Sequence, residues 1–173
     1  RELGVRTLFN LLGPLTNPAG AKRQLMGVFN KDLTLKLAKV LQNLGSEHVM
    51  VVHGADGMDE ISFTGDTFVA ELKDGKISEY TLNPAQFGFE NHDLSSIRVE
   101  NAQTSKAMIL NVLQAKTVAN QSSAAREIVL MNAGAAIYVA GLAANIKAGC
   151  ELAATVIDSG QALAKLEALK AYK

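Results

Sequence analysis

Two short apolar runs separated by a helical pattern constrain the fold of this chain most strongly. Residues 24–30 have the composition of a buried strand, and residues 48–53 form the nearly continuous apolar run that parallel strands show when both faces are covered. Between them, the apolar residues of 33–44 share one helical face, with Asp32 as the expected N-cap and Gly45 as the end. This order predicts two adjacent parallel strands joined by a right-handed crossover helix.

A β-hairpin is predicted in the middle of the chain. Two strand-like segments, Thr67–Lys73 and Lys76–Leu82, flank the dipeptide Asp74-Gly75. This dipeptide is a strong hairpin signal, because a type I′ turn needs a positive φ at both of its central residues. The hairpin adds an antiparallel excursion to the parallel unit.

Helical patterns occupy most of the remaining sequence. The glycine and proline at 13 and 14 are expected to stop the first helix, Ser159-Gly160 separates the last two, and residues 84–99 look irregular. The helical segments are 3–12, 105–114, 124–146, 149–157 and 161–171. We therefore predict one α/β domain with a mixed, largely parallel sheet flanked by helices.

Composition excludes several classes of protein. Lys plus Arg and Asp plus Glu both number 17 among the 173 residues, and no basic stripe stands out, which disfavours nucleic-acid binding. Cys150 is the only cysteine, and we expect it to be a small buried hydrophobic residue in a reducing compartment. The most apolar run, 133–146, is shorter than the roughly 20 residues of a membrane span. We expect a cytoplasmic protein.

The loop from residue 52 to residue 62, VHGADGMDEIS, carries the most chemistry. It places the adjacent carboxylates of Asp59 and Glu60 just past a buried strand, where α/β proteins bind ligands. Adjacent carboxylates suit a hard cation such as magnesium, which takes oxygen ligands and keeps waters for substrate phosphates. The alternative from spacing alone is a solvated acidic loop.

Other polar residues near this loop have simpler interpretations. Asp56 is a third carboxylate, but Asp56-Gly57 is also ordinary turn chemistry, which we favour. His53 could be a ligand or proton carrier, although a strand-end histidine bonded to backbone is the favoured interpretation. Gly13-Pro14 could equally be a simple helix stop.

Two blocks of this sequence resemble anthranilate phosphoribosyltransferases. The first is RELGVRTLFNLLGPLTNPA at residues 1–19, and the second is the VHGADGMDEIS loop at matching distance. The likeness continues through Asn132-Ala133-Gly134 and Ser159-Gly160, so it covers essentially the whole chain. The resemblance implies a catalytic domain of the nucleoside phosphorylase and phosphoribosyltransferase type.

The resemblance also implies a reaction and a set of site residues. Enzymes of this family join anthranilate to the ribose carbon of phosphoribosyl pyrophosphate, release pyrophosphate, and act in tryptophan biosynthesis. Asp59 and Glu60 match the pair that holds Mg²⁺, and Gly13 and Pro14 match the turn that lines the anthranilate path. An arginine that pairs with the anthranilate carboxylate is either Arg1 or the residue before it. The intact family protein is expected to be a homodimer.

Some family features do not occur between residues 1 and 173. We find neither the glycine-rich GTGGD-type loop nor the lysine-histidine-glycine-asparagine segment that bind phosphoribosyl pyrophosphate, nor the N-terminal helical domain. Residues 1–173 are therefore interpreted as the C-terminal part of the α/β domain, truncated at its N-terminus and inactive alone. Two alternatives remain open, a non-catalytic nucleic-acid-binding relative of the same fold and a pyrimidine nucleoside phosphorylase.

Overall fold

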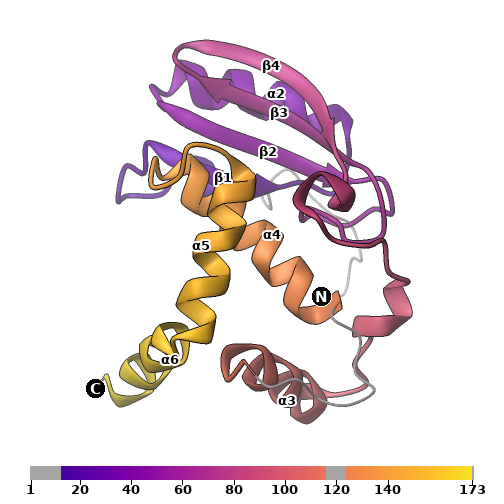
Figure 1. Ribbon diagram of the computed structural model, residues 1–173. Coiled ribbons are helices and arrows are strands. Elements are labelled where there is room, and N and C mark those ends of the chain that lie inside the picture. The colour runs from indigo at the N-terminus through magenta and orange to yellow at the C-terminus, as the bar shows by residue number, and fades with distance from the viewer. Residues whose placement is uncertain (1–12, 116–123, 173) are drawn as a thin grey trace, which may run out of the picture.

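The chain folds around one mixed β-sheet with helices on both faces (Figure 1). The computed structural model describes residues 13–115 and 124–172. The strands occur in the order β1-β2-β3-β4 across the sheet. Their bounds are Arg23–Gly27 for β1, His48–Gly54 for β2, Thr67–Lys73 for β3 and Lys76–Leu82 for β4.

Helices cover both faces of the sheet, and two further helices lie away from it. Helix α2 covers one face of the sheet, α4 and α5 lie on the other, and α3 and α6 lie at the end remote from the sheet (Figure 1). Two short 3₁₀ helices, η1 and η2, connect the hairpin to α3. The bounds are Asp32–Asn43 (α2), Pro84–Phe87 (η1), Leu94–Ile97 (η2), Ala102–Leu113 (α3), Ala124–Val139 (α4), Ile146–Asp158 (α5) and Gln161–Ala171 (α6).

The strand pairing confirms the predicted parallel unit and corrects its extent. Strands β1 and β2 pair in parallel and α2 connects them, as the sequence predicted. The β2–β3 and β3–β4 pairings are antiparallel. The described sheet is therefore mixed, with fewer parallel pairs than expected. The reason is that the chain leaves β2 through a loop and returns as a neighbouring strand, without the crossover helix that a parallel partner needs.

The start of α2 differs from the prediction by one residue. Asp32 is the first residue of the helix, and its N-cap is Lys31, which makes no side-chain cap. The Oδ1 atom of Asn30 accepts a hydrogen bond from the Asp32 backbone N–H at 2.9 Å, and so provides the missing cap from outside. Gly45, at φ +78°, ends the helix as expected.

The predicted helix at 124–146 is in fact two helices. Helix α4 ends at Val139, and Gly141 adopts a left-handed φ of +80° that reverses the chain. The side chain of Asn145 then accepts a hydrogen bond from the Ala148 N–H at 2.9 Å and starts α5. The prediction was too long because an apolar sequence hides this turn.

The predicted stop at Gly13-Pro14 is also displaced. Residues 13–15 are helical, and Gly13 does not have a positive φ, so the helical turn ends after Leu15. The predicted helix at 3–12 lies outside the described residues.

Strand β2 forms the centre of the core. Met50 and Val52 face the layer of α4 and α5, whereas Val49 and Val51 face α2, and all four are fully buried. Burial of each such side chain contributes about 1.5–3 kcal/mol. A strand covered on both faces explains why residues 48–53 are nearly all apolar.

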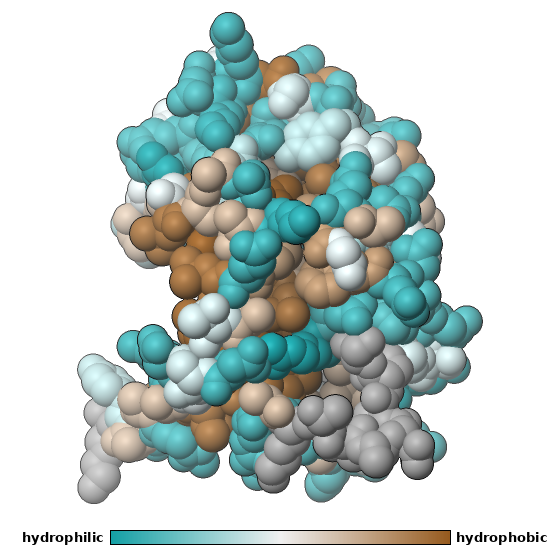
Figure 2. Space-filling model, in the orientation of Figure 1, coloured by the Kyte–Doolittle hydropathy of each residue, from teal (hydrophilic) through white to brown (hydrophobic). Residues whose placement is uncertain are grey.

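Helices α4 and α5 cross at glycines. A β-carbon added to Gly134 would lie 2.5 Å from the Cys150 backbone nitrogen, and one added to Gly149 would lie 2.2 Å from the Gly134 carbonyl oxygen. Cys150 is buried at this crossing, as predicted. On the face shown in Figure 2, apolar side chains gather where the molecule narrows below the sheet. Among the described residues, no helix is long and apolar enough to cross a membrane.

Candidate functional site

The acidic loop lies at the carboxyl edge of the parallel strand pair. Strand β2 ends at Gly54, and the chain then forms the loop before β3 begins at Thr67. The parallel neighbour β1 ends at Gly27, and a β-carbon on Gly27 would lie 1.6 Å from the Asp59 carbonyl oxygen. The loop backbone therefore rests directly on the end of β1. This is the edge at which α/β proteins bind ligands.

Asp56 organises the first half of the loop. Its Oδ1 atom accepts a hydrogen bond from the Met58 N–H at 3.0 Å, and its Oδ2 atom accepts from the hydroxyls of Ser62 at 2.7 Å and Thr64 at 2.8 Å. Burial alone would raise the pKa of Asp56, but these hydrogen bonds outweigh burial and lower the pKa. Asp56 is thus a turn residue with its oxygens occupied, as the sequence favoured.

Asp59 and Glu60 have no such internal partners. Both side chains are exposed, and neither forms a hydrogen bond or an ion pair with any other residue in 13–115 or 124–172. Partial burial raises the pKa of Glu60, and the negative charge of Asp59 raises it further. Two adjacent carboxylates with free oxygens and uncompensated charge fit a hard cation such as Mg²⁺.

A complete metal site would need ligands from elsewhere. Within the described residues, no group of three or more His, Cys, Asp or Glu side chains could hold a metal ion. Magnesium is often bound by one or two carboxylates, with water and substrate phosphate oxygens as the other ligands. The pair at 59 and 60 matches that arrangement.

His53 has the structural contact that the sequence favoured. Its Nδ1 atom lies 2.7 Å from the carbonyl oxygen of Val28, just beyond the end of β1. The carbonyl can only accept, so the ring nitrogen donates. This bond ties the ends of β1 and β2 together beneath the acidic loop.

The structure does not bring the predicted anthranilate turn to the acidic loop. Pro14 lines a hollow of about 160 Å³ together with Lys22, Gln24 and Ser46, at the beginning of β1. Asp59 lies at the other end of the same strand. A β-carbon added to Gly13 would have no atom of the described residues within 4 Å. The substrate roles of Gly13 and Pro14 remain predictions, and Arg1 lies outside the described residues.

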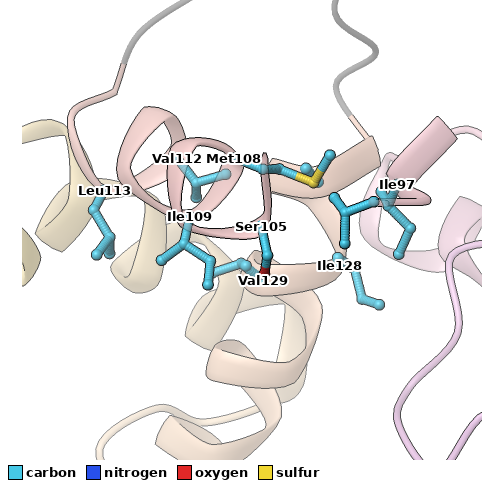
Figure 3. A pocket seen from close by; sticks show the side chains of 10 residues that line it. Ile97, Ser105, Met108, Ile109, Val112, Leu113, Ile128 and Val129 are labelled. Carbon is cyan, nitrogen blue, oxygen red and sulfur yellow. The ribbon is translucent and has the colours of Figure 1, made fainter. Parts of the chain in front are cut away.

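An apolar groove between α3, η2 and α4 lies apart from this chemistry. It has a volume of about 210 Å³, and side chains such as Met108, Ile109 and Ile128 line it (Figure 3). Ser105 is its only polar lining residue among those that the structure describes. Its described lining residues carry no charged group, so nothing in them indicates a metal or phosphate site.

Sequence reasoning missed two residues of the site. Gly27 was taken only as part of a strand, and Asn132 was noted only as part of a resemblance. Asn132 on α4 binds the backbone of Ile61, directly after Glu60. Both act through contacts between distant segments, so local patterns carried no signal for either.

The fold and site define an α/β protein with two exposed carboxylates in a loop at the carboxyl edge of a parallel strand pair. Comparison with known families makes this class specific. The chain belongs to the glycosyl transferase family, whose a/b domain model matches residues 1–163.

Its relatives include anthranilate phosphoribosyltransferases. The chain is 63% identical over 171 residues to that of Methylobacillus flagellatus and 57% identical over 172 residues to that of Thiobacillus denitrificans. Each alignment covers 99% of this chain and 49% of the relative. The chain therefore spans about half the length of the curated relatives it matches, and the resemblance stated from sequence is confirmed.

Solved structures confirm the predicted fold type. The anthranilate phosphoribosyltransferase of Thermus thermophilus matches with a TM-score of 0.84 at 36% identity, over 96% of this chain and 47% of that one. The Saccharomyces cerevisiae enzyme in complex with PRPP and Mg matches with a TM-score of 0.81 at 31% identity, with the same coverage.

Proposed function

We propose that the protein containing this chain is an anthranilate phosphoribosyltransferase. It would transfer phosphoribose from phosphoribosyl pyrophosphate to anthranilate and release pyrophosphate, a step of tryptophan biosynthesis. The single observation that carries the proposal is the exposed Asp59-Glu60 pair at the carboxyl edge of the parallel strands, whose carboxylates have no partner among residues 13–115 and 124–172. Relatives of this name at 57% and 63% identity support the choice of substrates.

The carboxylates of Asp59 and Glu60 would hold Mg²⁺ together with oxygens of the pyrophosphate group. A bound magnesium ion supplies positive charge that offsets the negative charge developing on the departing pyrophosphate. The yeast relative, whose structure contains PRPP and Mg, supports this choice of cation. The chain's own contribution would be the two adjacent carboxylates, carried on a loop whose backbone rests on the end of β1.

The acceptor side of the site would come from the start of the chain. Gly13 and Pro14 would line the path of anthranilate, because a residue without a β-carbon lets a flat ring approach the backbone. Arg1, or the residue before it, would pair with the anthranilate carboxylate through its planar guanidinium group. A yeast relative in complex with 4-fluoroanthranilate supports an aromatic acid as the acceptor.

The remaining grip on phosphoribosyl pyrophosphate would come from outside the chain. We infer that the glycine-rich loop and the lysine-histidine-glycine-asparagine segment lie in the half of the relatives that the chain does not cover. The intact protein would be a cytoplasmic homodimer that binds no nucleic acid. Balanced charge, with 17 basic and 17 acidic residues, supports the last point.

One assay distinguishes this function from its two alternatives. The product of the complete gene is incubated with anthranilate, phosphoribosyl pyrophosphate and magnesium, and separately with a pyrimidine nucleoside and phosphate. We expect fluorescent phosphoribosylanthranilate in the first reaction and no free base in the second. Phosphorolysis alone would identify a nucleoside phosphorylase. No turnover, with DNA binding that weakens steeply as salt rises, would identify the nucleic-acid-binding alternative.

A further inference from the structure

The side chain of Asn132 pairs with the backbone of a residue 71 positions earlier. Its Oδ1 atom accepts a hydrogen bond from the Ile61 N–H at 2.9 Å, and its Nδ2 atom donates to the Ile61 carbonyl oxygen at 3.0 Å. Nδ2 also donates to the carbonyl oxygen of Ile128 at 3.0 Å, within α4. Only this orientation of the amide satisfies all three contacts, since the two carbonyls need a donor and the N–H needs an acceptor.

Ile61 is the residue that directly follows the acidic pair. Its side chain is buried in the same apolar cluster as Met131 and Ala135 of α4. A polypeptide segment buried in this way must pair its backbone N–H and C=O, and Asn132 pairs both. The direction in which the chain leaves Glu60 is therefore fixed from α4.

On the N-terminal side of the acidic pair, the backbone of Asp59 is held by contact with the sheet. Asp59 has its carbonyl oxygen against Gly27 at the end of β1. The two carboxylates thus lie on a short span held at one end by a strand and at the other by the Asn132 amide. Neither carboxylate has a hydrogen bond of its own to orient it within residues 13–115 and 124–172.

We propose that Asn132 is a positioning residue for the metal-binding carboxylates of Asp59 and Glu60. It acts through the Ile61 backbone and touches neither substrate nor metal. The inference rests on the proposed function, because it assigns Asn132 to the same magnesium site. Groups that orient metal ligands from outside the coordination shell commonly change metal affinity by about 10- to 100-fold when removed.

A purely structural role for Asn132 needs a matched control. Asn145 caps α5 by accepting a hydrogen bond from the Ala148 N–H at 2.9 Å, and so also binds backbone through its amide. The neighbouring residues Ala143 and Ala144 line a hollow with Arg23 and His48, at the edge of the sheet opposite the acidic loop. Asn145→Ala therefore weakens a backbone contact of the same type without touching the loop.

The test uses the product of the complete gene and two readouts other than activity. Binding of manganese, as a paramagnetic substitute for magnesium, is measured by electron paramagnetic resonance in the presence of phosphoribosyl pyrophosphate. Amide hydrogen exchange of the peptide that contains Ile61 is measured by mass spectrometry. For Asn132→Ala we expect a manganese Kd raised about 10-fold and faster exchange at Ile61. Asn145→Ala should change neither.

A second substitution of Asn132 and a substitution of Asp59 complete the test. Asn132→Gln retains the amide on a longer side chain, and we expect a smaller change in the same direction; it replaces Asn132→Ala if that variant does not fold. An unchanged manganese Kd in both Asn132 variants, or an equal change in Asn145→Ala, overturns the proposal. If Asp59→Asn does not weaken manganese binding to the parent protein, the proposed metal site itself fails. Exchange at Ile61 then still reports whether Asn132 holds the loop.

Discussion

Gly27 and Asp59 are in backbone contact: a β-carbon added to Gly27 would lie 1.6 Å from the Asp59 carbonyl oxygen and 2.4 Å from its carbonyl carbon. Only glycine allows this approach of a loop to the end of a strand. The contact determines how closely the loop that carries Asp59 and Glu60 approaches the end of β1. The position of the proposed metal ligands thus depends on a residue 32 positions earlier in the sequence.

Gly27→Ala is expected to displace the acidic loop. The added methyl group would overlap the backbone carbonyl of Asp59, which cannot rotate away as a side chain can. The loop backbone must therefore shift away from β1 to remove the clash. We expect a fall in turnover of about 100-fold, because a displacement near 1 Å can cost that much, and a loss of stability of about 1–3 kcal/mol. Steady-state kinetics at saturating substrate measures the effect.

Gly65→Ala provides the control for this substitution. Gly65 lies in the same loop, and a β-carbon there would meet no atom of the described part of the chain within 4 Å. Its φ is not positive, so alanine introduces no backbone strain. Equal losses of activity in the two variants would contradict the argument from the Gly27 contact.

A buried carboxylate joins the sheet to α4 at the edge opposite the acidic loop. The Glu71 side chain accepts hydrogen bonds from His48 Nε2 at 2.8 Å, the Tyr80 hydroxyl at 2.7 Å and the Tyr138 hydroxyl at 2.8 Å. Lys73 donates in turn to the Tyr138 oxygen at 3.0 Å. Burial raises the pKa of Glu71, but the bonds from Tyr80, His48 and Tyr138 and the charge of His48 outweigh it and lower the pKa below 4.5.

This cluster predicts a specific loss of stability in acid. Because the folded-state pKa of Glu71 is lowered, the ionised carboxylate stabilises the fold above its ordinary pKa of 4.5, and this contribution disappears as pH falls through the lowered value. Glu71→Gln should cost about 3 kcal/mol at pH 7 and should flatten the acid side of the stability curve. Urea unfolding across the acid range measures both. Exposed Glu79→Gln should stay within about 0.5 kcal/mol of the parent protein; an equally flat curve for that variant would contradict the assignment.

Cys150 is expected to be unreactive in the folded protein. Burial at the α4–α5 crossing raises the pKa of its thiol to about 11, so about one molecule in a thousand carries the reactive thiolate at pH 8. A disulfide-forming chromogenic reagent should label it within seconds in denaturant and only at the rate of unfolding in buffer. Rapid labelling of the native protein would show that the crossing is open.

Local chemistry in the sequence predicted the elements whose causes are local. Asp74 and Gly75 adopt φ values of +50° and +75°, as the type I′ turn requires, and β3 and β4 have the predicted bounds. The spacing of apolar residues likewise located α2 and the parallel pair. The signals for each helix or strand lie within that element or the turn that bounds it, and the order of the elements then predicted the parallel pairing.

Features that depend on distant contacts were not predictable. Asn132 and Gly27 each meet a loop that folding brings to them from far along the sequence. Asp59 and Glu60 could be predicted as metal ligands because two adjacent carboxylates are recognisable in the sequence itself. Asn132 and Gly27, which contact the loop that carries them, have no such local pattern. The break between α4 and α5 is a separate case, because its signals, Gly141 and the Asn145 cap, are local and were outweighed by the apolar run around them.

Residues 1–173 alone are not expected to catalyse the proposed reaction. Holding two substrates in line is worth up to about 7–11 kcal/mol, and we infer that much of the grip on phosphoribosyl pyrophosphate lies in the half of the relatives not covered here. Calorimetry should detect no tight binding of phosphoribosyl pyrophosphate by this chain, with the complete gene product as the positive control. Turnover near that of the complete protein, from material whose mass corresponds to residues 1–173, would refute this expectation.

The magnesium dependence of a double variant tests the central claim most directly. In the complete protein, Asp59→Asn with Glu60→Gln removes both charges from exposed loop positions and should leave the unfolding transition within about 0.5 kcal/mol of the parent protein. The rate of phosphoribosylanthranilate formation is then measured as magnesium is varied. We predict a loss of turnover of about 10- to 100-fold. The magnesium concentration needed for the half-maximal rate should rise by a similar factor. Unchanged turnover with an unchanged magnesium response would contradict the account.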